Sequence, residues 1–159
     1  MLSRKEFLAL VLPSLDAGEQ YCTFGAKEDG EHKDISQRFV TSIDEICQHA
    51  DEFVAGTYNA FFALAKYGPE KRRSTNNAVA LKSFYADLDC GPGKPYGDLA
   101  DGMLALKDFC AATGLPKPTI VKSGMGAHLY WVCDESLPRK QWLRHAERLK
   151  ALCVQHKFE

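Results

Sequence analysis

Two aspartates at the end of an apolar run are the residues of this sequence best suited to chemistry. The run is Lys82-Ser83-Phe84-Tyr85-Ala86-Asp87-Leu88-Asp89-Cys90-Gly91, which predicts a strand that stops at Gly91-Pro92-Gly93. On a strand, Asp87 and Asp89 leave the same face, roughly 6.5–7 Å apart. Carboxylates are ligands that hard divalent cations prefer, so the pair can converge on one metal ion or on two. An Asp-x-Asp pair alone is equally typical of an ordinary strand end.

A glycine-rich turn ahead of a histidine is the second candidate. Its sequence is Ser123-Gly124-Met125-Gly126-Ala127-His128. Glycines let the backbone approach a ligand closely, and successive N–H groups can form a concavity that binds anions. His128 begins the next predicted strand and can donate a hydrogen bond to a phosphate. The simpler interpretations are a plain hairpin turn and a structural histidine.

A basic segment precedes the strand that carries the aspartates. Glu70-Lys71-Arg72-Arg73-Ser74-Thr75-Asn76-Asn77 is the most polar stretch of the chain and has its densest positive charge. A solvated loop is one interpretation. The other is a contact from Arg72 and Arg73 to the phosphates of a nucleotide or of a nucleic-acid backbone.

The elements that must position these residues follow from capping signals and periodicity. Capping boxes at Ser3–Glu6 and Ser42–Glu45 predict two helices, the second of which ends near Gly56. Asp98 begins a third helix that ends at Gly114, and Ser136 with Pro138 opens a fourth. Strands are predicted over 19–27, 58–67, 82–91 and in a hairpin over 117–134, and the charged segment 28–33 is predicted to be a loop.

Bulk properties limit the class of protein. The chain has 159 residues, 45% of them hydrophobic and 26% charged, as in one globular domain, and its net charge of −1 restricts any nucleic-acid binding to a local patch. No apolar run of membrane-spanning length and no signal peptide is found. The six cysteines form no Cys-x-x-Cys pair, which argues against a zinc ribbon and predicts reduced thiols in a cytoplasmic protein.

Taken together, Asp87-Leu88-Asp89 and the Ser123–His128 turn resemble the first two motifs of the archaeo-eukaryotic primase superfamily. The similarity is greatest to the primase-polymerases of phages, plasmids and mobile elements. It extends through the Gly93-Lys94-Pro95-Tyr96 loop, through Gly114–Pro118 and through the helix from Trp142 to Cys153. It covers residues 80–157 well, and the preceding region matches the family's N-terminal α/β unit only in outline.

The resemblance implies an α+β fold, with an N-terminal α/β unit over 1–78 and an antiparallel, RRM-like sheet backed by helices over 79–159. It implies that Asp87 and Asp89 bind catalytic Mg²⁺ or Mn²⁺, and that Ser123, Gly124, Gly126 and His128 hold the triphosphate of an incoming nucleotide. Lys94, Lys122, Arg72 and Arg73 are further phosphate contacts by charge and position. The implied partners are nucleoside triphosphates, a single-stranded DNA template with its primer, and a replicative helicase, fused or separate; no membrane is involved.

The expected activity is that of a DNA primase or primase-polymerase, a nucleotidyltransferase of DNA replication. The family has a third motif, an acidic metal ligand on a strand after the last helix predicted here, and this sequence has no match to it. We therefore expect 1–159 to be one catalytic domain truncated at its C-terminal end and poorly active alone. Two alternatives remain open: a replication-initiator or nucleic-acid-binding module without catalysis, and a metal-dependent nuclease.

Overall fold

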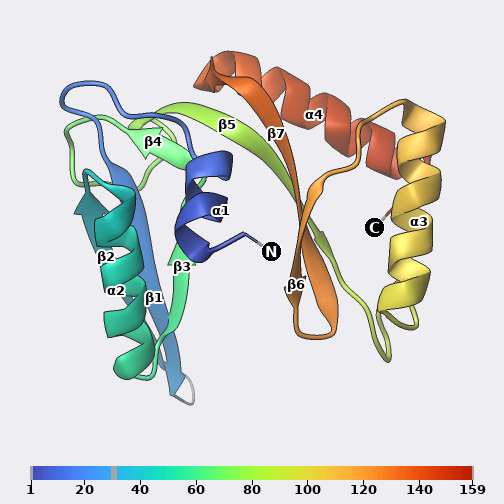
Figure 1. Cartoon of the computed structure of the whole chain (residues 1–159), viewed down its shortest axis with the longest axis horizontal. Coiled ribbons are helices and arrows are strands. Elements are labelled where there is room, and N and C mark those ends of the chain that lie inside the picture. Colours follow the sequence, from blue (N-terminus) through green and yellow to red (C-terminus); the bar gives the residue numbers. More distant parts are fainter. Residues whose placement is uncertain (1, 30–31, 159) are drawn as a thin grey trace. The chain divides into compact units, whose positions relative to one another are not determined.

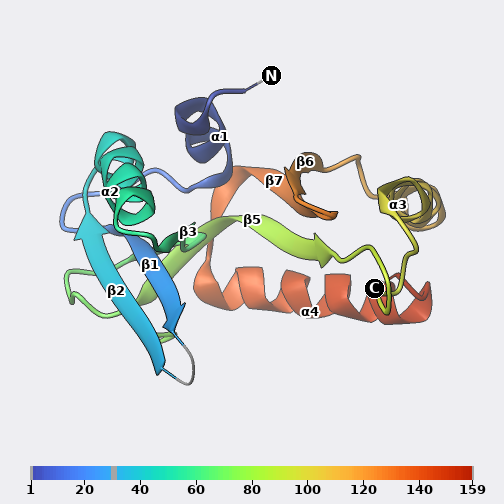
Figure 2. The same cartoon turned by 90° about the horizontal axis from the view of Figure 1, so that it is seen from below.

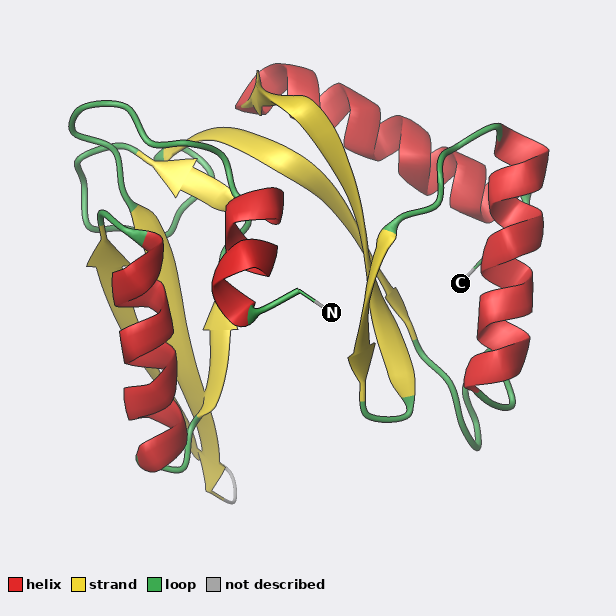
Figure 3. Cartoon of the chain, viewed as in Figure 1, coloured by secondary structure: helices red, strands yellow, loops and turns green. Residues whose placement is uncertain are grey.

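The computed structural model describes residues 2–29 and 32–158, and the chain forms two compact units. Unit 1 comprises the chain up to Lys82 together with Asp134–Arg139, and unit 2 comprises Ser83–Cys133 and the chain from Lys140 onward. Helices and antiparallel strands occur in both units, which confirms the predicted α+β class (Figure 3). No helix in the described ranges is long and apolar enough to cross a membrane.

Unit 1 contains a three-stranded antiparallel sheet with the strand order β2-β1-β3. Its elements in chain order are α1 (Arg4–Val11), β1 (Tyr21–Asp29), β2 (His32–Val40), α2 (Ile43–Ala55) and β3 (Asn59–Phe62). Both helices lie on the same face of this sheet (Figures 1 and 2). A Cβ atom at Gly25 of β1 would collide with the Phe53 ring of α2, so this glycine permits the helix to approach the sheet closely.

The predicted helix starts in unit 1 are confirmed. The Ser3 hydroxyl accepts a hydrogen bond from the Glu6 N–H, and the Glu6 carboxylate accepts one from the Ser3 N–H, which completes a capping box. The Ser42 hydroxyl accepts from the Glu45 N–H in the same way at the start of α2. Gly56 is the C-cap of α2, as predicted.

One strand prediction and one loop prediction in unit 1 were wrong. The apolar run 58–67 is two strands, β3 and β4 (Ala65–Tyr67), because the chain changes partner after Phe62, from β1 to β5. Uniform apolar composition gives no sign of such a change. The predicted loop 28–33 is also strand on both sides, since β1 reaches Asp29 and β2 begins at His32; Gly30 and Glu31 lie outside the described residues.

The second sheet has the strand order β4-β5-β7-β6. Its long strands, β5 (Ala78–Leu88) and β7 (Gly126–Pro138), each continue from one unit into the other, and β6 (Thr119–Ser123) forms the predicted antiparallel hairpin with β7. Because β7 runs through Pro138, Ser136 lies in the strand and α4 (Arg139–Gln155) begins later than predicted.

The core of unit 2 lies between the sheet and the helices α3 (Leu99–Thr113) and α4 (Figures 1 and 2). As predicted, the Asp98 side chain caps α3 by accepting from the Asp101 N–H, and Gly114 ends it in the left-handed region. The buried core residues are Leu88, Cys90, Leu106, Phe109, Ala127, Leu129, Trp131 and Phe158. Phe84 and Ala86 of β5 pack against this core, so the odd-numbered residues of β5 leave the opposite face.

The turn between β6 and β7 lies against the end of β5. Ser123 pairs directly with Gly126, so the turn consists of Gly124 and Met125 only, shorter than expected. Gly124 has a φ of 75°, the left-handed conformation that such a tight turn requires. A Cβ atom at Gly126 would collide with the backbone carbonyl of Leu88, so only glycine permits this approach of β7 to β5.

This contact gives a stability prediction with a matched control. Gly126→Ala should destabilise the chain by about 1–3 kcal/mol, because the added methyl group meets backbone atoms that cannot move aside. Gly124→Asn should cost less, since nothing lies within 4 Å of a Cβ there and asparagine adopts positive φ more readily than other non-glycine residues. Urea denaturation followed by circular dichroism measures both variants, and equal midpoints for Gly126→Ala and the parent chain would contradict the assigned packing.

Candidate functional site

The face of the unit 2 sheet opposite the helices brings the main predicted residues together. Tyr85 and Asp87 leave this face from β5, Asp89 follows directly after the end of that strand, and His128 and Tyr130 leave the face from β7. The Nε2 atom of His128 lies 3.8 Å from Oδ1 of Asp87. The Tyr85 ring packs edge-on against the His128 ring, with centroids 5.5 Å apart. Asp89 and His128 are 39 residues apart in the sequence. The acidic motif and the histidine are nevertheless neighbours on one surface of the folded chain.

Both carboxylates remain accessible to a ligand. The side chains of Asp87 and Asp89 are 50% and 56% exposed, so a cation can reach them without first opening the fold. The Nζ atom of Lys94 lies 2.8 Å from Oδ2 of Asp89, and this hydrogen bond raises the pKa of Lys94. Asp89 therefore already has one positive partner.

A tight loop after β5 places Lys94 beside Asp89. The Lys94 N–H donates to the carbonyl of Gly91, and the Gly91 N–H donates to the carbonyl of Tyr96. Gly91 and Gly93 both have positive φ, which allows the chain to reverse within a few residues. The glycine-rich composition that predicted a loop here is thus what returns the lysine to the acidic pair.

The β6–β7 register places Ser123 on the same face as His128. Val121 pairs with His128, and Ser123 follows two residues later, so both β6 side chains leave the face of the histidine. Gly124 is exposed at the turn, whereas Gly126 is buried against β5. The open end of the turn is therefore formed by Ser123 and Gly124.

The remaining predicted phosphate contacts lie elsewhere. Lys122 pairs with Ala127, a core residue, so its exposed side chain leaves the opposite face of β6 from Ser123. Arg72 and Arg73 lie in unit 1, in the loop between β4 and β5. Within that unit, the Arg73 guanidinium lies 4.2 Å from the centroid of the Phe24 ring. Contacts of these three residues with a nucleotide stay predictions.

Two tyrosines of this face were given no role from the sequence. The Tyr85 and Tyr130 rings lie 5.4 Å apart, next to the acidic pair. Burial, and then the charges of Asp87 and Asp89, raise the pKa of Tyr85 to about 12, and burial likewise raises the pKa of Tyr130. Both phenols are therefore neutral at physiological pH. In the sequence, Tyr85 lies two residues before Asp87 and Tyr130 two residues after His128. On a strand, this spacing places each tyrosine on the same face as its functional neighbour, which was the available signal.

The donor set fits part of a divalent-metal site. Asp87 and Asp89 offer oxygen atoms from one open face, which suits Mg²⁺ or Mn²⁺. In the described part of the chain, no group of three or more His, Cys, Asp or Glu residues is arranged to hold a metal ion. Water and the phosphate oxygens of a bound nucleotide are the ordinary additional ligands of Mg²⁺ in such sites.

Comparison with known proteins bears on the fold. No protein-family model and no curated protein sequence matches this chain. Among solved structures, the AEP domain of the cyanophage S-2L primase-polymerase (PrimPol) superimposes with a TM-score of 0.64, covering 93% of this chain and 70% of that chain at 18% sequence identity. This chain therefore has the fold of a primase-polymerase AEP domain, and the resemblance predicted from the two motifs is confirmed at the level of the fold.

Proposed function

We propose that this chain is the nucleotide-binding part of a metal-dependent nucleotidyltransferase, a primase-polymerase that extends a primer on a single-stranded DNA template during replication. One observation carries the proposal: Asp87, Asp89 and His128 share an open sheet face beside a glycine turn. The fold, which the primase-polymerase AEP domain shares, supports the same reading.

Each residue has a distinct task in this proposal. Asp87 and Asp89 hold the divalent metal, which when bound lowers the pKa of the attacking 3′-hydroxyl and neutralises charge on the phosphates. Ser123, the Gly124 N–H and His128 hold the triphosphate. The 3′-oxygen then forms a bond to the α-phosphorus while the bond to pyrophosphate breaks, and the hydroxyl proton passes to solvent. The two aspartates act as metal ligands that position the reacting groups, and neither serves as a general base.

Lys94 is proposed to exchange partners when the nucleotide binds. In the structure its ammonium group balances the charge of Asp89. A metal ion on Asp89 would repel it, and a phosphate would attract it, so the lysine would move from carboxylate to phosphate as the site fills. An exposed ion pair of this kind contributes only about 0.2–1 kcal/mol, which makes the exchange easy.

The acidic pair is the first test. Asp87→Asn with Asp89→Asn should weaken Mg²⁺-dependent binding of a nucleoside triphosphate by at least about 10–100-fold, because loss of groups that merely support metal ligands already costs that much. Isothermal titration of the triphosphate with and without Mg²⁺ measures the effect. Binding of a single-stranded oligonucleotide should be unchanged in the same variant.

Lys94 gives an independent test with the opposite sign. Lys94→Met should raise the affinity for Mn²⁺ alone by about two- to fivefold, since it removes the cation that competes for Asp89. It should at the same time weaken triphosphate binding. Electron paramagnetic resonance of Mn²⁺ counts the free ion, with Asp89→Asn as the control that must lose affinity. A parallel loss of Mn²⁺ in both variants would contradict the proposed exchange.

A nucleic-acid-binding module without catalysis is the second candidate, since no group of three or more His, Cys, Asp or Glu residues in the described ranges is arranged to hold a metal ion. That reading expects the double Asn variant to change neither triphosphate nor oligonucleotide binding. A nuclease would instead need the metal while showing no triphosphate affinity, so the same titration separates all three functions.

A further inference from the structure

The three-stranded sheet of unit 1 has a second face, opposite α1 and α2. Gly25 lies beneath the Phe53 ring of α2, and its neighbours Phe24 and Ala26 therefore leave the other side of β1. The register of β2 and β3 gives the residues that share this outer face: Phe24, Ala26, Ile35, Gln37, Asn59 and Phe61.

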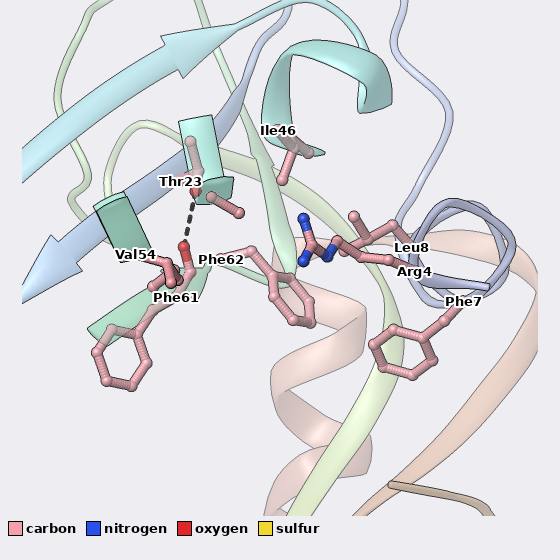
Figure 4. Close-up of a pocket in the computed structure, with 10 residues that line it drawn as sticks. Arg4, Phe7, Leu8, Thr23, Ile46, Val54, Phe61 and Phe62 are labelled. Atoms are coloured by element: carbon pink, nitrogen blue, oxygen red, sulfur yellow. Dashed lines mark hydrogen bonds between the residues drawn. The ribbon is translucent and has the colours of Figure 1, made fainter. Parts of the chain in front are cut away.

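Figure 4 shows the helix side of the same strands. A hollow of about 260 Å³ lies there among residues of α1, α2, β1 and β3. The Phe62 side chain points toward Leu8 and Phe7 of α1, whereas the Phe61 ring points away from them. Phe61 thus borders the hollow while its ring belongs to the outer face, and its carbonyl accepts a hydrogen bond from Thr23 that fixes this arrangement.

Three planar groups form a row on the outer face. The Phe24 and Phe61 rings are stacked, with centroids 5.2 Å apart and planes 15° from parallel. The Arg73 guanidinium, from the loop between β4 and β5, lies 4.2 Å from the Phe24 centroid. Burial raises the pKa of the Cys22 thiol to about 11 and the Arg73 charge partly opposes the rise, which is consistent with the guanidinium lying over this face.

The row ends in an accessible aromatic ring. Phe61 is 45% exposed and belongs to β3, an edge strand of the sheet. Ile35, on the opposite edge strand, is 43% exposed. Gln37 and Asn59 add exposed amides between and beside these apolar groups. Such a face offers aromatic rings, amides and a guanidinium group together on one side of the sheet.

We propose that this outer face binds single-stranded nucleic acid, with bases stacking in line with Arg73, Phe24 and Phe61. Unpaired bases stack on aromatic rings and on guanidinium planes, and amide side chains can hydrogen-bond their edges. The identity of that strand as the template rests on the proposed function; the binding itself does not.

The charge distribution favours the same occupant. The whole chain has a net charge of −1, so no overall field attracts a polyanion. The loop that supplies Arg73 nevertheless has Lys71 and Arg72, both exposed, within two residues of it. Three cations in this one loop can provide local phosphate contacts, and the affinity should fall with salt with a logarithmic slope of only about −2.

Phe61 is the residue to test, by fluorescence anisotropy of a labelled single-stranded deoxyoligonucleotide with the full chain. Phe61→Ala should weaken binding by about tenfold, the typical effect of losing one stacked base. Phe61→Leu should weaken it comparably, because leucine keeps apolar area and lacks a π-face, while Phe61→Tyr should retain binding. Val54→Ala is the matched control, since Val54 is an apolar residue of α2, 63% exposed, that lines the hollow on the helix side of the sheet and is not part of the stacked row.

The Leu variant also decides between occupants. Full oligonucleotide binding by Phe61→Ala would overturn the proposal. Full binding by Phe61→Leu, with weakened binding by Phe61→Ala, would also overturn it and would indicate that the face binds through apolar contact alone. Circular dichroism of each variant confirms folding, and the retained binding of Phe61→Tyr guards against a misfolding artefact.

Arg73 and the catalytic face separate this inference from the proposed function. Arg73→Lys keeps the charge and loses the plane, so it should weaken oligonucleotide binding by about fivefold with an unchanged salt slope. Triphosphate binding should be unaffected by every Phe61 variant. If the Asp87 and Asp89 variants leave triphosphate binding intact while Phe61→Ala weakens oligonucleotide binding, the proposed function fails and the stacking surface stands.

Discussion

The contact between Gly126 of β7 and the Leu88 carbonyl of β5 is the constraint on which the candidate site depends. Leu88 separates the two aspartates, and Gly126 begins β7 directly after the turn, opposite Ser123. Any larger residue at 126 would push the turn away from the acidic strand. A backbone-to-backbone contact of this kind fixes the spacing between the motifs more tightly than side-chain packing alone, because neither partner has a rotamer to change.

The opposite face of the same strands supplies the support. Leu88, Ala127 and Leu129 are fully buried against the helices. Successive side chains of β5 and β7 therefore point alternately into the core and toward the candidate site. Shifting either strand by one residue would move aspartates into the core and leucines into solvent. The Trp142 indole N–H, which donates to the carbonyl of buried Ser83, further ties α4 to β5. Core packing and site geometry are therefore two consequences of one register.

The sequence predicted the parts of this arrangement that depend on local chemistry. Capping at Ser3, Ser42 and Asp98, the left-handed Gly114 and the β6–β7 hairpin all follow from short-range hydrogen bonds. The prediction from sequence failed where the structure of a segment depends on which strand it pairs with. The run 58–67 divides between two sheets, and β1 and β2 continue to Asp29 and from His32 despite their charged residues, because each strand is stabilised by hydrogen bonds to the other. Periodicity placed Tyr85 beside Asp87, but nothing short of the β5–β7 pairing could bring His128 and Tyr130 to them.

The arginine segment shows how the same limit affects function. Charge alone made Arg72 and Arg73 candidates for phosphate, and charge is all that a sequence displays. Arg73 lies over the ring of Phe24, a residue of β1 that is nearly fifty positions earlier in the sequence. This contact adds a second possible role for the guanidinium group. A planar cation held over a ring presents a surface to bases as well as a charge to phosphates. Stacking of bases on such planes requires no excess of positive residues, so a net charge of −1 is compatible with the proposed binding of single-stranded nucleic acid.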